Sequence, residues 1–135
     1  MNENYKYADL TEIIIGAFYN VYNQLGHGFF EKVYERAMMI ELPLQGLKCE
    51  CQKNIKVYYK EVEIGDYFAD ILVEDVIIIE IKAVEMILPI HEVQLVNYLK
   101  ATGKEVGLLL NFGSKPQFKR RVFSNNYHDD HNQSY

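Results

Sequence analysis

The feature that most constrains the fold is a pair of strongly apolar segments that each carry charged residues. The sequence Ile-Leu-Val at positions 71–73 directly follows Asp70, and Glu80 interrupts an apolar run at positions 76–81. Strands this apolar are usually covered on both faces, where a charge is rarely left without a partner. The two-residue gap Glu74-Asp75 predicts that the segments form an antiparallel hairpin. We therefore expect Asp70 and Glu80 on adjacent strands.

The charges in this hairpin have the arrangement that a metal site requires. Glu80 and Lys82 lie two residues apart, so they point to the same face of a strand. Two carboxylates and a backbone carbonyl supply the oxygen ligands that Mg²⁺ prefers, and Lys82 would lie beside the water that the cation activates. Glu31, on a preceding helix, would add a third acidic group. A Glu-x-Lys triplet alone also occurs on ordinary exposed strands, so the prediction depends on Asp70 and on the apolar context.

Length and charge limit the class of protein. The chain has 135 residues, which is long enough for one domain with a substantial core. Its formal net charge is −5. An acidic balance disfavours a large nonspecific nucleic-acid footprint but does not exclude a nuclease, because the carboxylates of a metal site contribute to it. Four cations cluster late in the chain and form either a solvated face or a phosphate contact: Lys115, Lys119, Arg120 and Arg121.

The remaining composition indicates a reduced, cytoplasmic protein. No apolar run approaches the roughly 18–20 residues that span a bilayer, and we expect no secretory leader at the N-terminus. Cys49 and Cys51 lie too close along one strand for an ordinary disulfide, and no further Cys or His follows at zinc-like spacing. We interpret both as reduced packing residues.

Periodicity predicts two helices before the strands. Apolar residues recur at helical spacing over residues 10–25, and Asp9 with Glu12 resembles a capping box at the start of this helix. The second helix is expected over residues 29–42, with Pro43 marking its end.

Strands are expected over residues 48–52, 55–59, 67–73 and 76–83, followed by a helix over 90–102 and a strand over 106–111. Residues 113–123 are ambiguous. The predicted fold class is therefore α/β (α+β), a central mixed sheet with flanking helices in the order ααββββαβ. We expect an N-terminal extension at 1–8, one domain at 9–123 and a flexible polar tail at 124–135.

Several polar residues allow two interpretations. Gln94 and Tyr98 share a helix face and could reach a polar ligand, or could be a satisfied amide and an ordinary core tyrosine. His91 could face the same cleft or serve the start of the helix. His27 is expected to be a turn residue. His128 and His131 have metal-ligand spacing, but they lie in the predicted tail.

The motifs together resemble the small GxxExxY family, which is placed in the PD-(D/E)XK nuclease superfamily. The resemblance covers residues 9–123 and is carried by five segments: residues 28–34 (Gly-Phe-Phe-Glu-Lys-Val-Tyr), 70–75, 79–83, 94–100 and 106–113. Two positions depart from the family pattern. His27 stands where a proline is expected, and Tyr22 stands where a histidine is common.

The resemblance implies a restriction-endonuclease-like core and assigns roles to seven residues. The catalytic set would be Asp70, Glu80, Lys82, Glu31 and Gln94, with Asp70, Glu80 and Glu31 as metal ligands and with Tyr98 and Tyr34 as substrate contacts. The implied activity is hydrolysis of phosphodiester bonds in DNA with Mg²⁺ or Mn²⁺, without membrane association; a homodimer is left open. The alternative is a catalytically weak or inactive nuclease-like module that binds nucleic acid or a protein partner.

Overall fold

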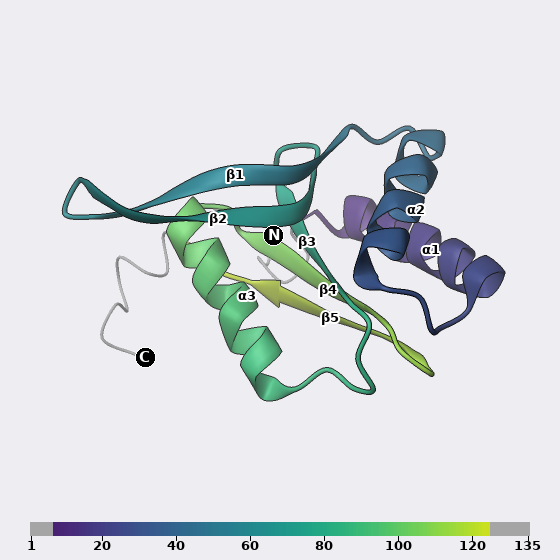
Figure 1. Cartoon of the computed structure of the whole chain (residues 1–135). Helices are drawn as coiled ribbons and strands as arrows, with labels where there is room; N and C mark the ends of the chain where they lie inside the picture. The colour runs from purple at the N-terminus through teal and green to yellow at the C-terminus, as the bar shows by residue number, and fades with distance from the viewer. Residues whose placement is uncertain (1–6, 125–135) are drawn as a thin grey trace.

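The computed structural model describes residues 7–124, which form three helices and a five-stranded sheet (Figure 1). The helices are α1 (Ala8–Leu25), α2 (Glu31–Leu44) and α3 (Pro89–Thr102). The strands are β1 (Cys49–Tyr59), β2 (Val62–Val73), β3 (Ile77–Lys82), β4 (Val106–Phe112) and β5 (Pro116–Val122). They lie in the order β1-β2-β3-β4-β5, and only the β3–β4 pair among them is parallel. The predicted fold class, a mixed sheet with flanking helices, is confirmed.

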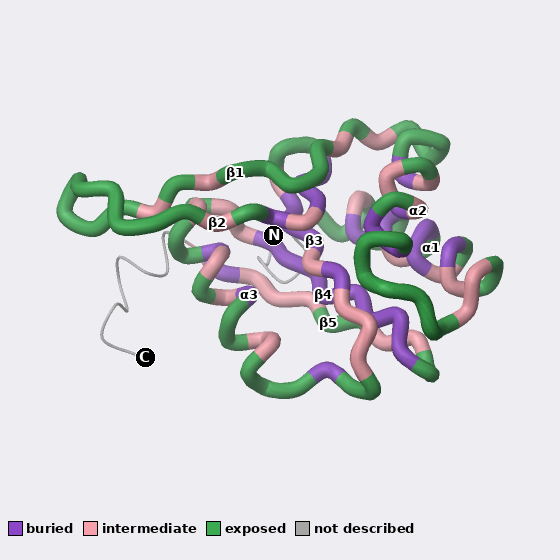
Figure 2. Tube along the Cα trace, viewed as in Figure 1, coloured by how far each residue is buried: buried purple, intermediate pink, exposed green. Residues whose placement is uncertain are grey.

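Helices cover both faces of the central strands. The α1 and α2 side contains Phe18 and Met38, packed with the odd-numbered residues of β3 in one buried cluster. The α3 side contains Leu95 and Leu99, which pack with Ile78. All seven residues of β4 are buried as a result, and Figure 2 shows the burial concentrated in β3 and β4. Strand alternation therefore directs Glu80 and Lys82 toward the α3 side.

Both hairpins of the first three strands turn through residues in the left-handed region. Two residues, Lys60 and Glu61, separate β1 from β2, whereas residues 74–76 separate β2 from β3, because β3 begins at Ile77 and not at the predicted position 76. Glu74 and Asp75 have φ values of 51° and 61°, and Lys60 and Glu61 have φ values of 50° and 69°. Such turns match the twist of paired strands. The predicted hairpin across Glu74-Asp75 is confirmed. The β1–β2 hairpin extends beyond the rest of the sheet, and its end is exposed (Figures 1 and 2).

The predicted element order was wrong in two places. Residues 48–52 and 55–59 were expected to be separate strands, but β1 is continuous because Lys53 and Asn54 pair with β2. Their polar side chains lie on an exposed ribbon, where polarity does not interrupt a strand. The ambiguous segment 113–123 contains β5, so the order is ααβββαββ.

The helix boundaries also differ from the prediction. Helix α1 begins at Ala8, before Asp9, and has no side-chain cap, so the predicted capping box is wrong. Pro43 lies inside α2, one residue before its end, where the missing N–H removes only one bond of the last turn. The expected end of α3 at Gly103 is confirmed by a left-handed φ of 75°.

Both ends of the chain were assigned roles that the structure does not address. Most of the extension expected at 1–8 and nearly all of the tail expected at 124–135, including His128 and His131, lie outside the described residues. Across the described part of the chain, no helix combines the length and the apolar character needed to cross a membrane.

A rigid corner joins the end of β3 to the end of β4. Asn111 is fully buried, and its side-chain amide bonds both the N–H and the C=O of Val84 at 2.9 Å. Gly113 packs against the same backbone, since a Cβ at this position would lie 2.2 Å from the Val84 oxygen. The Tyr22 hydroxyl, at the position where a histidine is expected, bonds the Gly113 oxygen at 2.8 Å and the Ser114 oxygen at 2.9 Å. The chain beyond Lys82 is thereby fixed.

This corner predicts a glycine requirement. Gly113→Ala should lower the free energy of unfolding by about 1–3 kcal/mol, because backbone atoms must move to admit the Cβ. Urea denaturation of purified protein measures the change. The control is Gly16→Ala on α1, whose Cβ would meet nothing within 4 Å; it should stabilise the helix by about 0.5–1 kcal/mol. Equal stability of Gly113→Ala and the wild type would contradict the packing described.

Candidate active site

The site begins where the β2–β3 ladder ends. The paired residues run from Val73↔Ile77 to Ile71↔Ile79 and stop there. At the next step, side chains replace main-chain pairing. The Asp70 carboxylate accepts the Ile81 N–H at 2.8 Å. The Glu80 carboxylate lies close enough to the Asp70 main chain for that N–H to lower the Glu80 pKa. Two carboxylates that sequence patterning predicted on adjacent antiparallel strands thus meet at the end of the ladder, where Asp70 is bonded across it.

The regular alternation of β2 is interrupted at the same point. Tyr67 and Ala69 contact the α3-side cluster, whereas Ile71 belongs to the cluster under α1 and α2. On the other edge, the β1–β2 pairs skip Asp70 and Gln52, and Gln52 has a φ of 52°. Asp70 can therefore interact with α2 while Glu80 interacts with the α3 side.

Two stacked tyrosines surround Glu80. The Tyr67 hydroxyl donates a hydrogen bond to the Glu80 carboxylate. Its ring stacks on that of Tyr98, with centroids 3.7 Å apart and planes inclined by 17°. The β2 tyrosine thus links the acid on β3 to the helix α3.

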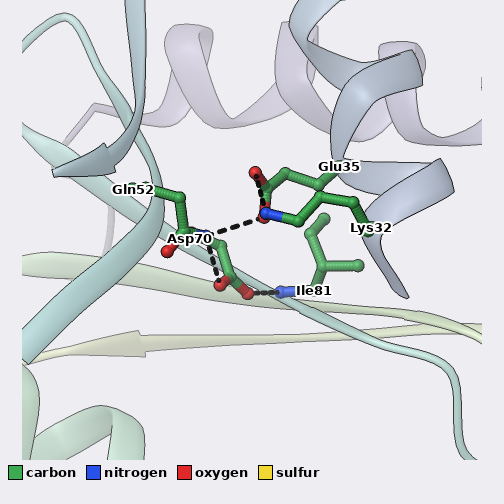
Figure 3. A network of polar contacts seen from close by, with 5 residues as sticks. All are labelled: Lys32, Glu35, Gln52, Asp70 and Ile81. Atoms are coloured by element: carbon green, nitrogen blue, oxygen red, sulfur yellow. Dashed lines mark hydrogen bonds and ion pairs between the residues drawn. The ribbon is translucent and has the colours of Figure 1, made fainter. Parts of the chain in front are cut away.

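A polar network surrounds Asp70 on the other side (Figure 3). The Gln52 amide donates to Asp70 at 3.4 Å and to Glu35 at 2.9 Å. Glu35 lies on α2, is only 6% exposed, and also forms an ion pair with Lys32 at 3.3 Å. The network fixes the Asp70 carboxylate between β1, β3 and α2.

Burial and the charges of neighbouring carboxylates raise the pKa of both strand carboxyls. Burial first, and then the charge of Asp70, raises the pKa of Glu80 to about 7, although bonds from Tyr67 and the Asp70 main chain and the charge of Lys82 oppose this rise. The pKa of Asp70 is raised by burial and by the charges of Glu35 and Glu31, against the bond from Ile81. An added cation would relieve this repulsion.

The four other predicted site residues that remain to be placed differ in how closely they approach Asp70 and Glu80. Lys82 is half-buried and close enough to Glu80 to affect its pKa. Glu31 is the exposed first residue of α2 and acts electrostatically on Asp70. Tyr98 contacts the centre through Tyr67. Gln94 is exposed one helical turn before Tyr98 and takes part in none of the side-chain hydrogen bonds observed within residues 7–124.

Tyr34 requires a correction. It was predicted to contact substrate, but it is fully buried and stacks on Phe112 with ring centroids 4.2 Å apart. Its hydroxyl donates to the Gly26 oxygen at 2.7 Å and accepts the Phe29 N–H at 3.2 Å. The tyrosine therefore supports the loop that precedes Glu31 and does not face a ligand.

Sequence reasoning missed three residues of the site: Glu35, Gln52 and Tyr67. Glu35 had a usable signal, since it follows Glu31 by four positions and therefore shares its helix face. Gln52 and Tyr67 had none, because their contacts depend on how β1, β2 and β3 pair over long sequence separations.

Other polar residues have local roles. His91 accepts the Leu88 N–H at 3.0 Å and so serves the start of α3. Cys49 and Cys51 are free thiols; Cys49 packs against the core, whereas Cys51 is exposed, so the interpretation of Cys51 as a packing residue is wrong. The late basic cluster is divided, because Arg121 pairs with Glu92 on α3 and the adjacent residue Arg120 bonds Thr11 on α1 at 3.5 Å. The four cations therefore do not form one phosphate-binding face.

The donor set fits a hard divalent cation through two carboxylates. No group of three His, Cys, Asp or Glu side chains in residues 7–124 is arranged to hold a metal ion, so Asp70, Glu80 and Glu31 do not form a ready three-ligand set. Mg²⁺ usually keeps several waters and binds protein through one or two carboxylates. Asp70 and Glu80, which are partly desolvated and repel each other, supply that number.

Comparisons with known proteins agree with this geometry. A family model described as the PD-(D/E)XK nuclease superfamily matches residues 8–122. The chain is also similar to the crystal structure of SSO0001, with a TM-score of 0.55 and 20% identity, covering 90% of this chain and 62% of that one. At this identity the likeness shows the fold alone, and the present chain spans less than two thirds of SSO0001. The curated proteins contain no match.

The raised pKa of Glu80 predicts a pH-dependent stability difference. Folding favours its protonated form, so its contribution to stability is complete below the ordinary pKa of 4.5 and is lost as the pH rises to about 7. Glu80→Gln removes the ionisation while keeping an oxygen that can accept the bonds from Tyr67 and Asp70. The variant should exceed the wild type in free energy of unfolding by about 1–3 kcal/mol above pH 7.

Urea denaturation between pH 4.5 and pH 8 tests this expectation. The difference between Glu80→Gln and the wild type should shrink toward the acidic end. Glu61→Gln, on the exposed β1–β2 turn, controls for the loss of one negative charge. A constant difference across the range would show that Glu80 does not titrate as proposed.

Proposed function

Because the chain belongs to the PD-(D/E)XK nuclease superfamily, we propose that it is a Mg²⁺-dependent nuclease that hydrolyses phosphodiester bonds in DNA. The observation that carries the proposal is the approach of the Asp70 and Glu80 carboxylates where the β2–β3 ladder ends, with Asp70 bonded to the Ile81 N–H and Lys82 two residues beyond Glu80 on β3. Two half-buried carboxylates that repel each other add little to the stability of the fold by themselves. A bound cation would neutralise their charge, and a phosphate would pair with the cation and with Lys82.

Each proposed role follows from the position of the residue. Asp70 and Glu80 would hold the cation, which when bound polarises the phosphate and lowers the pKa of water. Lys82 would act in one of two ways: as the ammonium it would stabilise negative charge developing on the phosphate, or as the neutral amine it would accept a proton from the attacking water. Glu31 and Gln94, on the exposed rim, would orient water, and Tyr98 would contact the substrate. Glu35 and Gln52 would keep Asp70 in place.

We also infer the finer family membership, the GxxExxY family, from residues 28–34. The roles of these residues support it. Gly28 has a left-handed φ of 110° in the loop, Glu31 begins α2 beside Asp70, and Tyr34 holds the loop from below. The three residues that define the motif thus form one structural unit next to the site.

A second candidate function has a specific observation in its favour. The described residues contain no preformed three-ligand metal group, and the net charge is −5. A catalytically weak module that binds nucleic acid or a protein partner would be consistent with both. Cation binding and turnover separate the two candidates.

The first test concerns the cation. Millimolar Mg²⁺ or Mn²⁺ should raise the melting temperature of the wild type, since binding to the folded state alone adds about 2.7 kcal/mol at 100 times Kd. The double variant Asp70→Asn, Glu80→Gln should lose the effect while keeping the main-chain bonds. The matched control is Glu63→Gln, Asp66→Asn, which removes two carboxylates around Lys56 on the exposed ribbon. An unchanged wild-type melting temperature would argue strongly against a metal site.

The second test concerns turnover. Lys82→Ala should reduce the rate of DNA cleavage by about 100-fold or more, because a charge that stabilises the transition state is lost. Fold and cation-induced stabilisation should remain. Lys82→Arg should not restore activity, since guanidinium stays protonated and is bulkier. Lys104→Ala is the control, because its ammonium pairs with Asp75 at the other end of β3.

The assay uses purified protein with single- and double-stranded DNA and RNA. Equal cleavage by the wild type and Lys82→Ala would assign the activity to a contaminant or another site. If no substrate is cut with Mg²⁺ or Mn²⁺, the binding module becomes the better account.

A further inference from the structure

A cleft adjoins the proposed catalytic residues at the ends of β3 and β4. It has a volume of about 300 Å³, with the loop 27–30 on one side and residues 83–85 and 112–114 on the other. We call it the aromatic cleft, because Phe29 and Phe30 are 47% and 87% exposed at its edge. Exposure alone does not distinguish Phe30, since Leu44 is 74% exposed; its position beside Phe29 at the edge of a cleft does.

The loop 27–30, which forms the first wall of the cleft, is supported by the buried side chain of Tyr34. Tyr34 bonds both Gly26 and the main chain of Phe29, and the Phe29 ring meets the Tyr34 ring edge-on at 6.0 Å. Tyr34 itself stacks on Phe112 in the core. The loop therefore presents Phe30 from a fixed base, so little ordering is needed when a ligand contacts it.

The second wall is equally fixed. The Asn111 side-chain amide accepts the Val84 N–H through its oxygen and donates to the Val84 carbonyl through its nitrogen, and Ser114 donates to Glu85 at 2.8 Å. The Tyr22 hydroxyl bonds the main chain at residues 113–114. Two preorganised walls thus enclose a space that is small, partly apolar and open to solvent.

Both walls are continuous with the proposed active site. Phe30 directly precedes Glu31, and Ala83 directly follows Lys82. A nucleic-acid strand whose phosphate lay beside Lys82 would therefore have its next base within reach of this cleft. Lys115, which is exposed directly after Ser114, adds a positive charge near the second wall.

We propose that the aromatic cleft binds one unstacked nucleobase of a single-stranded nucleic acid, with Phe30 as the stacking residue. The inference rests on the nuclease function proposed above and names its substrate class. A cavity of this volume lies at the small end of ligand sites and admits one base but not a base pair within a duplex. Bases inside a duplex stack on one another, whereas a single strand offers free π-faces to aromatic side chains.

The test measures binding separately from cleavage. Full-length Lys82→Ala protein with Mg²⁺ is titrated into fluorescently labelled single-stranded DNA and RNA oligonucleotides and into the corresponding duplex. Adding Phe30→Ala or Phe30→Leu should weaken single-strand binding by about 5- to 100-fold, because stacking of one base is lost. Phe30→Tyr should retain it. Leu44→Ala, 74% exposed at the far end of α2, is the control for losing an exposed apolar group.

Three results would overturn the proposal. Phe30→Leu could bind a single strand as well as the wild type does, or the duplex could bind more tightly and show the same loss. Sedimentation could also reveal a dimer that Phe30→Ala dissociates, which would assign the residue to a contact between copies. The two proposals fail separately. If the protein cleaves nucleic acid but its binding does not depend on Phe30, only the proposed base site is rejected. If single-strand binding depends on Phe30 but no substrate is cleaved, only the proposed nuclease activity is rejected.

Discussion

The Asp70 carboxylate accepts the Ile81 main-chain N–H from the opposite strand, and the architecture of the site depends on this bond. Without it, β2 and β3 would either continue their ladder or separate with an unsatisfied backbone group, which is costly when buried. With it, the β2–β3 pairing ends at Asp70; β2 remains paired with β1 in the long ribbon, and β3 continues beside β4 as far as Lys82. The carboxylate that ends the ladder is also one of the two that would hold the proposed cation.

Placing carboxylates at this half-buried position has an energetic cost, which is seen in the raised pKa values of Asp70 and Glu80. Burial disfavours the charged form of both carboxyls and so raises the pKa of each; the charge of Asp70 adds to the rise at Glu80, and the charges of Glu35 and Glu31 add to the rise at Asp70. Tyr67, Gln52 and Lys82 offset part of the cost by donating hydrogen bonds or supplying charge. Isosteric amide variants preserve the backbone bonds, whereas alanine would remove the structural acceptor together with the charge. Loss of activity after an alanine substitution at either acid would thus not distinguish catalysis from folding.

The sequence was sufficient to predict what local patterning controls. Two apolar runs separated by Glu74-Asp75 predicted the β2–β3 hairpin, and Pro89 with Gly103 predicted the bounds of α3; both elements are confirmed. The continuity of β1 through Lys53 and Asn54 could not be predicted in this way, because it depends on pairing with β2. The same limit applies to the site. Carboxylates on one hairpin were found from spacing, whereas Gln52 and Tyr67 reach them only through tertiary contacts.

The buried position of Tyr34 connects these findings. A tyrosine in a motif beside an acidic residue suggested a substrate contact, but its hydroxyl and ring are fully used in holding Gly26, Phe29 and Phe112. Its effect is therefore indirect: it fixes the loop whose next residues are the exposed Phe30 and the acidic Glu31. Asn111 does the same for the chain after Lys82. Two buried polar residues, one from each side of the cleft, thus hold rigid the segments that would contact a substrate, which is where preorganisation contributes most to binding and catalysis.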